Sequence, residues 1–300
     1  MARLEVQHST VYRYRNPVTF GEHRLMFRPR DSHDLRLIDT KLVISPKAEI
    51  RWLHDVFNNS IAVATFRDSS NILSFESRIE VDHYGLFYPV FPIEPYAQTV
   101  PFTYRSEEQP DLGRTTECHY PDPEYLVEKW ARTFLGNKGY AETETLLMKI
   151  AQAINKEFDY EFRTEPGVQT PVQTLQRRAG SCRDLSLFMM EAVRCLGIAA
   201  RFVSGYLYDK NLDDTGQALV GGGATHAWVQ IYIPGAGWVE YDPTNGLAGG
   251  MNLIRVAVAR DPTQALPLEG SFMGTPDDFI DMTVEVTVKR LDTPAKEHVS

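Results

Sequence analysis

Residues 180–197 read GSCRDLSLFMMEAVRCLG, in which a cysteine separates two small residues from a largely apolar run that ends at a glycine. The spacing predicts a helix over residues 182–196 that is apolar on most sides, is stopped by Gly197, and is buried in the centre of a domain. A cysteine in the first turn of such a helix lies near unpaired N–H groups and the positive end of the helix dipole, which favour thiolate over thiol. Cys182 is therefore a candidate nucleophile, although a small buried residue at a helix start needs no function.

The segments around this helix predict an α+β domain. Helical periodicity covers residues 123–136 and 142–158, and the second of these carries an apolar stripe. Strand-like segments follow the cysteine helix at residues 200–208, 226–233 and 237–242. Helices followed by an antiparallel sheet are an α+β arrangement.

The first third of the chain has a different pattern. Short stretches with alternating β-branched or aromatic and polar residues extend to about residue 105, as in LEVQHSTVYRY at residues 4–14. Prolines and a polar stretch then mark a junction near residues 105–122. We predict an antiparallel β-sandwich-like domain over residues 1–110 and an α+β domain over residues 111–300. FIDMTVEVTVKRL, at about residues 279–291, predicts a C-terminal strand that returns to one of the sheets.

Composition excludes several classes of partner. The chain has 300 residues and a formal net charge of -9, with acidic and basic residues mixed along its length. No electrostatic footprint for nucleic acid is visible, and no segment has the length and apolarity of a signal peptide or membrane span. We expect a cytoplasmic protein that binds neither nucleic acid nor membrane.

The three cysteines, Cys118, Cys182 and Cys195, lack CxxC spacing. They fit neither a disulfide framework nor a structural zinc site, and they favour a reducing compartment. Cys195 is expected to be a core residue of the cysteine helix. We predict no metal and no cofactor.

A second candidate segment is THAWVQIYIPGAGWVEYDPTNG, residues 225–246, which predicts two strands joined by a PGAG turn. Alternation gives its first strand one apolar face and one polar, aromatic face. The polar face of the two strands comprises His226, Trp228, Gln230, Tyr232, Trp238, Glu240 and Asp242. Trp228 and Trp238 are therefore expected to line a site that contains His226 and Asp242.

The turn decides whether His226 and Asp242 can meet. If Ile233 paired with Trp238, Asp242 would lie on the wrong face. If Ile233 instead lies opposite Gly237, Asp242 lies opposite Trp228 and diagonal to His226, within reach of a hydrogen bond. We predict this second register, in which Asp242 orients one nitrogen of His226 and the other nitrogen faces Cys182. A structural histidine and a turn-forming aspartate remain the alternatives for the two residues taken singly.

The polar, glycine-rich segment at residues 209–224 precedes His226 and could be a mobile flap. Its DKNLDDTG motif lacks the glycine and glutamate that a calcium loop requires, so we predict no ion site there.

Three stretches together resemble the transglutaminase-like superfamily, whose core is papain-like. They are RRAGSCRDLSLFMMEAVRCLGIAARFVSGYLY, THAWVQIYI and GWVEYDPTNG. The first half of the chain, with HSTVYRYRNPVTFGEHRLMFRPR, is similar to the β-rich N-terminal region of many bacterial members.

The resemblance implies a role for each candidate residue. Cys182 would be the nucleophile, His226 the general base and acid, and Asp242 the residue that orients His226. Gln176 would match a papain-like oxyanion glutamine six residues before the cysteine, although Gln173 competes for that role. Asp184 also matches the local pattern, and we interpret it first as a stabiliser of the helix start.

The implied reaction is acyl transfer through a thioester. Because the much longer crosslinking enzymes carry features for which this chain has no room, we predict a cysteine hydrolase of peptide or amide bonds that acts on a peptide or protein. A protein-glutamine transglutaminase and a catalytically silent peptide-binding scaffold remain alternatives. The substrate and the oligomeric state are left open.

Overall fold

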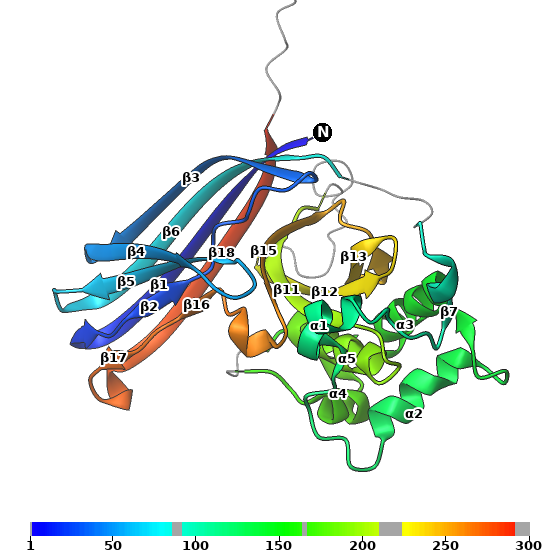
Figure 1. Ribbon diagram of the computed structural model, residues 1–300. Coiled ribbons are helices and arrows are strands. Elements are labelled where there is room, and N and C mark those ends of the chain that lie inside the picture. The colour runs from blue at the N-terminus through cyan, green and yellow to red at the C-terminus, as the bar shows by residue number, and fades with distance from the viewer. Residues whose placement is uncertain (1, 86–91, 164–166, 210–223, 292–300) are drawn as a thin grey trace, which may run out of the picture.

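Two packed regions make up the part of the chain that the computed structural model describes, which is residues 2–85, 92–163, 167–209 and 224–291. A β-sandwich lies on one side and an α+β core on the other (Figure 1). This is the fold class predicted from the sequence. Most of the segment proposed as a flap, residues 210–223, lies outside the described residues.

The first sheet of the sandwich is built around one long strand, β1 (Ala2–Phe20), whose neighbours are all antiparallel. Its other strands are β3 (Leu35–Ser45), β6 (Ser70–His83), β17 (Phe272–Met273) and β18 (Phe279–Leu291). β18 pairs with β1 over most of its length, which confirms that the C-terminal segment returns to a sheet. The two ends of the described chain therefore lie side by side in one sheet.

The second sheet of the sandwich is shorter. Its strands, in spatial order, are β16 (Leu268–Glu269), β2 (His23–Leu25), β5 (Ser60–Phe66) and β4 (Ala48–His54). Apolar residues of both sheets form one buried cluster, to which Phe20, Leu25, Ala64, Leu73 and Phe75 belong. Alternating side chains of the predicted strands supply this cluster, because every second residue of a strand points to the same face.

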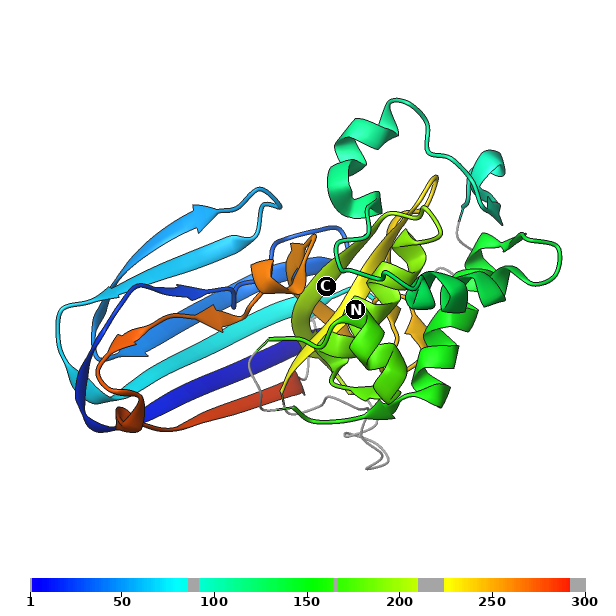
Figure 2. The same cartoon turned by 90° about the horizontal axis from the view of Figure 1, so that it is seen from below.

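The four longer helices of the core are gathered on one side of its sheet, whereas the shortest helix lies apart from them and packs through Leu112 near Tyr232 and Trp238 (Figures 1 and 2). The helices are α1 (Glu108–Leu112), α2 (Leu126–Arg132), α3 (Thr143–Glu157), α4 (Pro171–Arg177) and α5 (Cys182–Arg194). The apolar stripe of α3 is buried at Leu146, Ile150 and Ile154, as its periodicity predicts. Two pairs of short strands link these helices: β7 (Thr99–Val100) with β8 (Ala141–Glu142), and β9 (Asp159–Tyr160) with β10 (Ala179–Gly180).

α5 is the central helix, and all of its residues except Arg183 are buried. It ends before Gly197, whose φ of 80° lies in the left-handed region that favours glycine. Both findings confirm the prediction for this helix. The prediction for Cys195 is wrong in part, because this residue is half-buried and lies beside exposed Cys118.

The core sheet is antiparallel and strongly curved (Figure 1). Its strands, in spatial order, are β14 (Leu247–Ala248), β13 (Gly237–Asp242), β12 (Thr225–Ile233), β11 (Ala200–Leu207) and β15 (Leu253–Ala259). The apolar face of β12 shares a buried cluster with α5 through Ala227, Val229 and Ile231. The opposite face is therefore free to carry the polar and aromatic residues of β12 and β13.

The sandwich and the core are joined by apolar packing and by polar contacts. Leu4 and Val6 of β1 share a cluster with Tyr206 and Ile254 of the core. Asn59 of the sandwich imitates a strand partner: its Nδ2 donates to the carbonyl of Val258 at 2.7 Å, and its Oδ1 accepts from the N–H of Val258 at 2.9 Å. Such paired contacts fix the relative position of the two regions.

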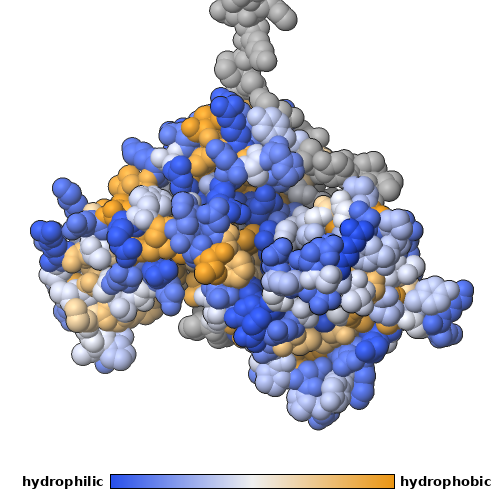
Figure 3. Space-filling view, viewed as in Figure 1, coloured by the Kyte–Doolittle hydropathy of each residue, from blue (hydrophilic) through white to orange (hydrophobic). Residues whose placement is uncertain are grey.

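Hydrophilic side chains cover most of the face shown in Figure 3, and its hydrophobic residues form separate small groups. Among the residues that the structure describes, none of the helices combines the length and the apolarity needed to cross a bilayer.

Candidate active site

The start of α5 is fixed by its own capping residues. The backbone N–H and the hydroxyl of Ser181 both donate to Oδ2 of Asp184, at 2.9 and 2.8 Å. The carboxylate lies in the first turn, where it also interacts favourably with the helix dipole. Gly180 permits the close approach, because a Cβ there would come within 2.8 Å of the Asp184 Cβ. Cys182 thus has a defined position at the tip of the helix.

Asp184 also ties neighbouring segments to this helix start. Its Oδ1 accepts from Arg163 at 2.8 Å and from the backbone N–H of Gln169 at 2.7 Å. The aspartate side chain has no exposed surface, and its charge is balanced by Arg163 and stabilised by these N–H donors. The structure therefore gives Asp184 the helix-start position that its sequence suggested, with a wider set of partners.

The register of β12 and β13 is the one predicted from the sequence. Ile233 pairs with Gly237, and the ladder continues to Val229 opposite Tyr241. Asp242 thus reaches the face that carries His226. Nε2 of His226 lies 2.9 Å from Oδ2 of Asp242, which confirms that these side chains meet.

Asp242 is held by the turn that follows it. Its Oδ1 accepts from the backbone N–H groups of Thr244 and Asn245, at 3.0 and 3.3 Å. Its Oδ2 accepts from Nδ2 of Asn245 at 2.8 Å. Burial opposes ionisation of Asp242, but His226 and Asn245 lower its pKa below the ordinary value. The carboxylate is therefore ionised and rigid at neutral pH.

His226 is buried beside two groups that affect its charge. Burial lowers its pKa, but the charge and hydrogen bond of Asp242 and the polar contact with Cys182 raise it to about 10. Nδ1 makes no hydrogen bond of good geometry with any described residue. Asp242 thus holds Nε2 of His226, and Cys182 contributes to the raised pKa of the same ring.

Trp228 lies next to this histidine in the interior of the curved sheet. Its ring is stacked with that of His226, with centroids 6.0 Å apart. Its Nε1 donates to Glu240, which also accepts from Gln230 at 2.7 Å. Gly205 makes room, because a Cβ there would lie 2.7 Å from the indole of Trp228. Trp228 therefore forms a wall behind His226 and is fully buried.

Trp238 lies farther from His226 and Asp242. It is four residues before Asp242, which along a strand corresponds to about 13 Å. Its ring packs against Tyr232 and lies under the guanidinium of Arg201, 4.1 Å from the ring centroid. Trp238 also lines two cavities, of about 540 and 380 Å³. The structure thus brings Trp228, but not Trp238, against His226.

The glutamines considered for an oxyanion role lie on α4. Gln176 is exposed, and the side chain of Gln173 accepts from the backbone N–H of Thr170 in a capping interaction. Sequence reasoning missed Gln169, which is buried and whose amide atoms have no partner among the described residues. Its burial depends on the backbone contact with Asp184, which no local pattern reveals.

Tyr160 is a neighbour of Cys182 that the sequence did not indicate. It belongs to β9 and pairs with Gly180 of β10, just before the cysteine. Tyr160 is exposed, but partial desolvation of its phenol and the nearby charge of Cys182 raise its pKa to about 12. Its phenol therefore stays protonated at neutral pH and can donate a hydrogen bond near the sulfur.

No group of three or more His, Cys, Asp or Glu side chains within the described ranges is arranged to hold a metal ion. The described residues thus give no ligand set for a metal.

Comparisons with known families agree with this architecture. Residues 129–243 match the model of the transglutaminase-like superfamily, and residues 4–82 match the bacterial transglutaminase-like N-terminal region. The first match contains Cys182, His226 and Asp242. The chain belongs to the transglutaminase-like superfamily. More particularly, it joins a transglutaminase-like core to a bacterial transglutaminase-like N-terminal region.

Similar proteins extend over nearly the whole chain. An uncharacterized protein of Mycobacterium leprae is 26% identical over 290 residues, which cover 96% of this chain and 99% of that protein. An uncharacterized protein of Mycobacterium tuberculosis is 27% identical over 296 residues, with 95% and 92% covered. The solved structure of a "Putative Cysteine Protease" from Cytophaga hutchinsonii has a TM-score of 0.68 and 18% identity, with 98% and 92% covered. The last similarity shows a shared fold.

Proposed function

We propose that this protein is a cysteine hydrolase of peptide or amide bonds, with Cys182 as nucleophile, His226 as acid and base, and Asp242 as the residue that orients His226. The observation that carries the proposal is the geometry of the His226 ring. Asp242 holds Nε2, whereas Nδ1 has no described hydrogen-bond partner and the ring interacts with Cys182. This is the arrangement that nucleophilic catalysis by a thiol requires.

The reaction would proceed in two acyl-transfer steps. The Cys182 thiolate attacks the carbonyl carbon, and the imidazolium of His226 gives its proton to the leaving amine. Water, activated by the neutral imidazole, then attacks the thioester and releases the acid. The raised pKa of His226 supports the first step, because the ring is charged at neutral pH.

Developing negative charge on the carbonyl oxygen needs donors near Cys182. The backbone N–H of Cys182, at the helix tip, is one donor in this proposal. The phenol of Tyr160 is our preferred side-chain donor, because Tyr160 pairs with Gly180, two residues before Cys182, and its phenol is protonated at neutral pH. The side chains of Tyr160 and Gln176 are both exposed, so variants of the two residues decide between them.

Labelling with a library of peptide electrophiles tests the nucleophile. We expect Cys182 to be labelled rapidly below pH 7, and we expect His226→Ala to slow that labelling strongly. Cys118→Ser is the matched control, because it removes an exposed thiol outside the site. Equal labelling rates in the native protein and in His226→Ala would refute the proposal.

The transglutaminase alternative differs only in the molecule that attacks the thioester, which is a primary amine instead of water. Incubation with a glutamine-containing protein and a fluorescent primary amine separates the two enzymes. Transamidation attaches the amine to the protein, whereas hydrolysis leaves the protein without the fluorophore and yields a glutamate side chain or a peptide fragment. We expect hydrolysis.

A catalytically silent scaffold would bind peptide and show ordinary reactivity at Cys182.

We further propose a peptide or protein substrate and a cytoplasmic location, as the composition predicts. Cell fractionation followed by immunodetection tests the location.

A further inference from the structure

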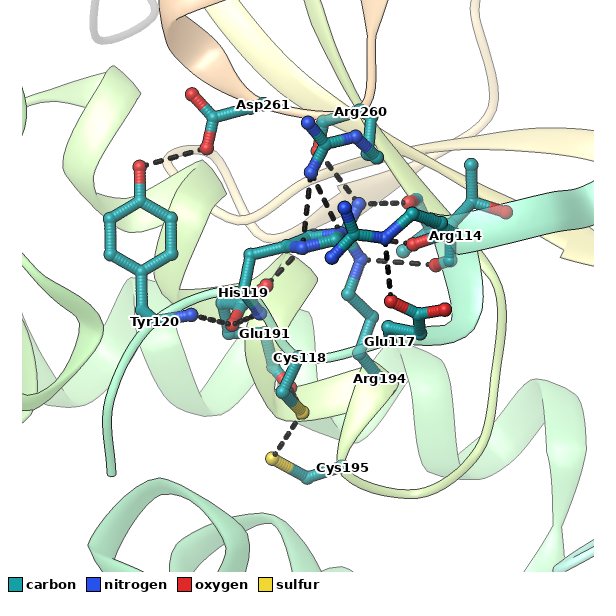
Figure 4. Close-up of polar contacts among 12 residues, drawn as sticks. Arg114, Glu117, Cys118, His119, Tyr120, Glu191, Arg194, Cys195, Arg260 and Asp261 are labelled. Atoms are coloured by element: carbon teal, nitrogen blue, oxygen red, sulfur yellow. Dashed lines mark hydrogen bonds and ion pairs between the residues drawn. The ribbon is translucent and has the colours of Figure 1, made fainter. Parts of the chain in front are cut away.

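Two cysteines that the proposed chemistry does not use lie together at the other end of α5. Sγ of Cys118 is 3.2 Å from Sγ of Cys195, the residue that follows the last residue of this helix (Figure 4). The two residues are 77 positions apart in the chain, and both are free thiols. A disulfide holds its sulfurs about 2.05 Å apart, so bond formation requires an approach of only about 1.1 Å.

A network of buried polar contacts holds the two cysteines in this position. The backbone N–H groups of His119 and Tyr120 both donate to Oε2 of Glu191, at 2.8 and 3.1 Å (Figure 4). Glu191 in turn pairs through Oε1 with Arg194 at 2.8 Å, and neither side chain is appreciably exposed. His119, the residue after Cys118, is therefore bound to Glu191, which lies one helical turn before Cys195.

Arg194 attaches the same segment a second time. Its Nε donates to the carbonyl of Thr115 at 3.0 Å, and its Nη2 donates to the carbonyls of Ala200 and Arg260 at 2.7 and 2.8 Å. Residues on both sides of Cys118 are thus bound to the end of α5. The approach of the sulfurs is built into the fold and does not depend on surface side chains.

The two thiols differ in a way that suits stepwise oxidation. Cys118 is exposed and Cys195 is half-buried. The contact between the two sulfurs lowers the pKa of Cys118 and raises the pKa of Cys195. Cys118, which is also the exposed cysteine, is therefore the one that ionises more readily and that an external reagent meets first, and Cys195 reacts second.

We propose that Cys118 and Cys195 form a reversible disulfide when the protein meets a low-molecular-weight disulfide, RSSR. The Cys118 thiolate attacks one sulfur of RSSR, the S–S bond of the reagent breaks, and RS⁻ leaves. Cys195 then loses its proton to solvent, and its sulfur attacks Sγ of Cys118 and expels the second RS⁻. In total, two protein thiols and RSSR give one intramolecular disulfide and two RSH.

The second step becomes easier once the first has occurred. The contact with Cys118 is the main cause that raises the pKa of Cys195, and the negative charge of Cys118 adds to it. Conversion of Cys118 to a mixed disulfide removes that charge. Cys195 can then ionise next to the sulfur that it attacks.

The native fold should favour the bond strongly over an unfolded chain. A loop of this length loses much closure entropy when it is cross-linked in the unfolded state, so the bond should raise Tm by about 5 °C or more. A bond that stabilises the fold is itself stabilised by the fold to the same extent. The equilibrium constant for forming this disulfide by exchange with oxidised glutathione should therefore be about a hundredfold larger in native protein than in urea-denatured protein.

Peptide mapping of the whole chain after equilibration with reduced and oxidised glutathione tests the proposal. Trypsin places the three cysteines in separate peptides, at residues 115–129, 179–183 and 195–201. We expect a linked pair of peptides 115–129 and 195–201 that disappears on reduction. Glutathione adducts on Cys118 without the linked pair, or a linked pair that contains Cys182, would overturn it.

Matched variants make the result independent of the proposed enzyme activity. The linked pair and the rise in Tm should persist in Cys182→Ser, which removes the third thiol. Both should vanish in Cys118→Ser, whose reduced Tm should stay within about 1 °C of the reduced native protein because residue 118 is exposed. An equal effect of oxidant on the Tm of native protein and Cys118→Ser would contradict the assignment.

Discussion

The two ends of α5 carry the same residue type in opposite surroundings. At the first residue, Cys182 is buried and interacts with an imidazole that a carboxylate holds. Just past the last residue, Cys195 is half-buried and faces a second sulfur. The first setting favours attack on carbon by a thiolate, and the second favours a sulfur–sulfur bond. The chemistry that we propose for each cysteine thus depends on the side chain that the tertiary fold places beside it, which is an imidazole for Cys182 and a second thiol for Cys195.

Each end is also fixed by one buried carboxylate of the helix. Asp184 accepts from Arg163 and from the backbone of Gln169, and Glu191 accepts from Arg194 and from the backbone of two residues after Cys118. The two acids thus attach a different loop to each end of the same helix. The two ends are alike in how they are built and differ in what they can do.

The largest expected effect separates the two cysteines by activity. Cys182→Ala should lower turnover of any peptide or amide substrate about 10⁴-fold or more, because no other group replaces the nucleophile. Cys195→Ser should retain turnover within about twofold, because that residue lies outside the proposed site. Initial rates on the substrate found by labelling measure both, and comparable losses in the two variants would contradict the proposed division.

The next effect concerns the two buried acids. Asp184→Ala and Glu191→Ala should each lower the free energy of unfolding by about 3–5 kcal/mol. Asp184→Ala removes the acceptor of the buried N–H groups of Gln169 and Ser181, and Glu191→Ala removes the charge partner of buried Arg194. Urea denaturation measures the loss. The exposed pair of Arg132 and Glu128 supplies the control: Glu128→Ala should cost at most about 1 kcal/mol.

The His226–Asp242 pair should make stability depend on pH. Because the pKa of His226 is raised from 6.5 to about 10, its contribution to stability is fully present below pH 6.5 and is lost as pH rises through about 10. We expect native protein to lose about 3 kcal/mol relative to Asp242→Asn between pH 6 and pH 10, because the variant cannot stabilise the imidazolium. Urea unfolding at several pH values tests this, and parallel curves for the two proteins would disprove it.

The smallest effect concerns the oxyanion. Tyr160→Phe should lower turnover about 10- to 100-fold with little change in KM, since it removes one donor near Cys182. Gln176→Ala should change turnover by less than about twofold. The reverse order of the two effects would restore Gln176 as the donor.

Much of the site could be predicted from the sequence because its determinants are local. Helical periodicity and Gly197 predict α5, and strand alternation with the PGAG turn predicts the register that brings Asp242 to His226. A resemblance carried by three short motifs then suggested the roles. The positions of Gln169 and Tyr160 could not be predicted in this way, because they reach the site through contacts with Asp184 and Gly180.

By itself, the sequence determined the class of fold, the buried helix with the cysteine at its start, and the two strands that carry the histidine and the aspartate, because hydrophobic periodicity and turn chemistry act over a few residues. Only the tertiary structure decided that Cys118 lies against Cys195, that Trp238 lies away from His226, and that β18 completes the first sheet. Those contacts join segments far apart along the chain. Burial and packing of the whole molecule select them, and no local pattern encodes such a selection.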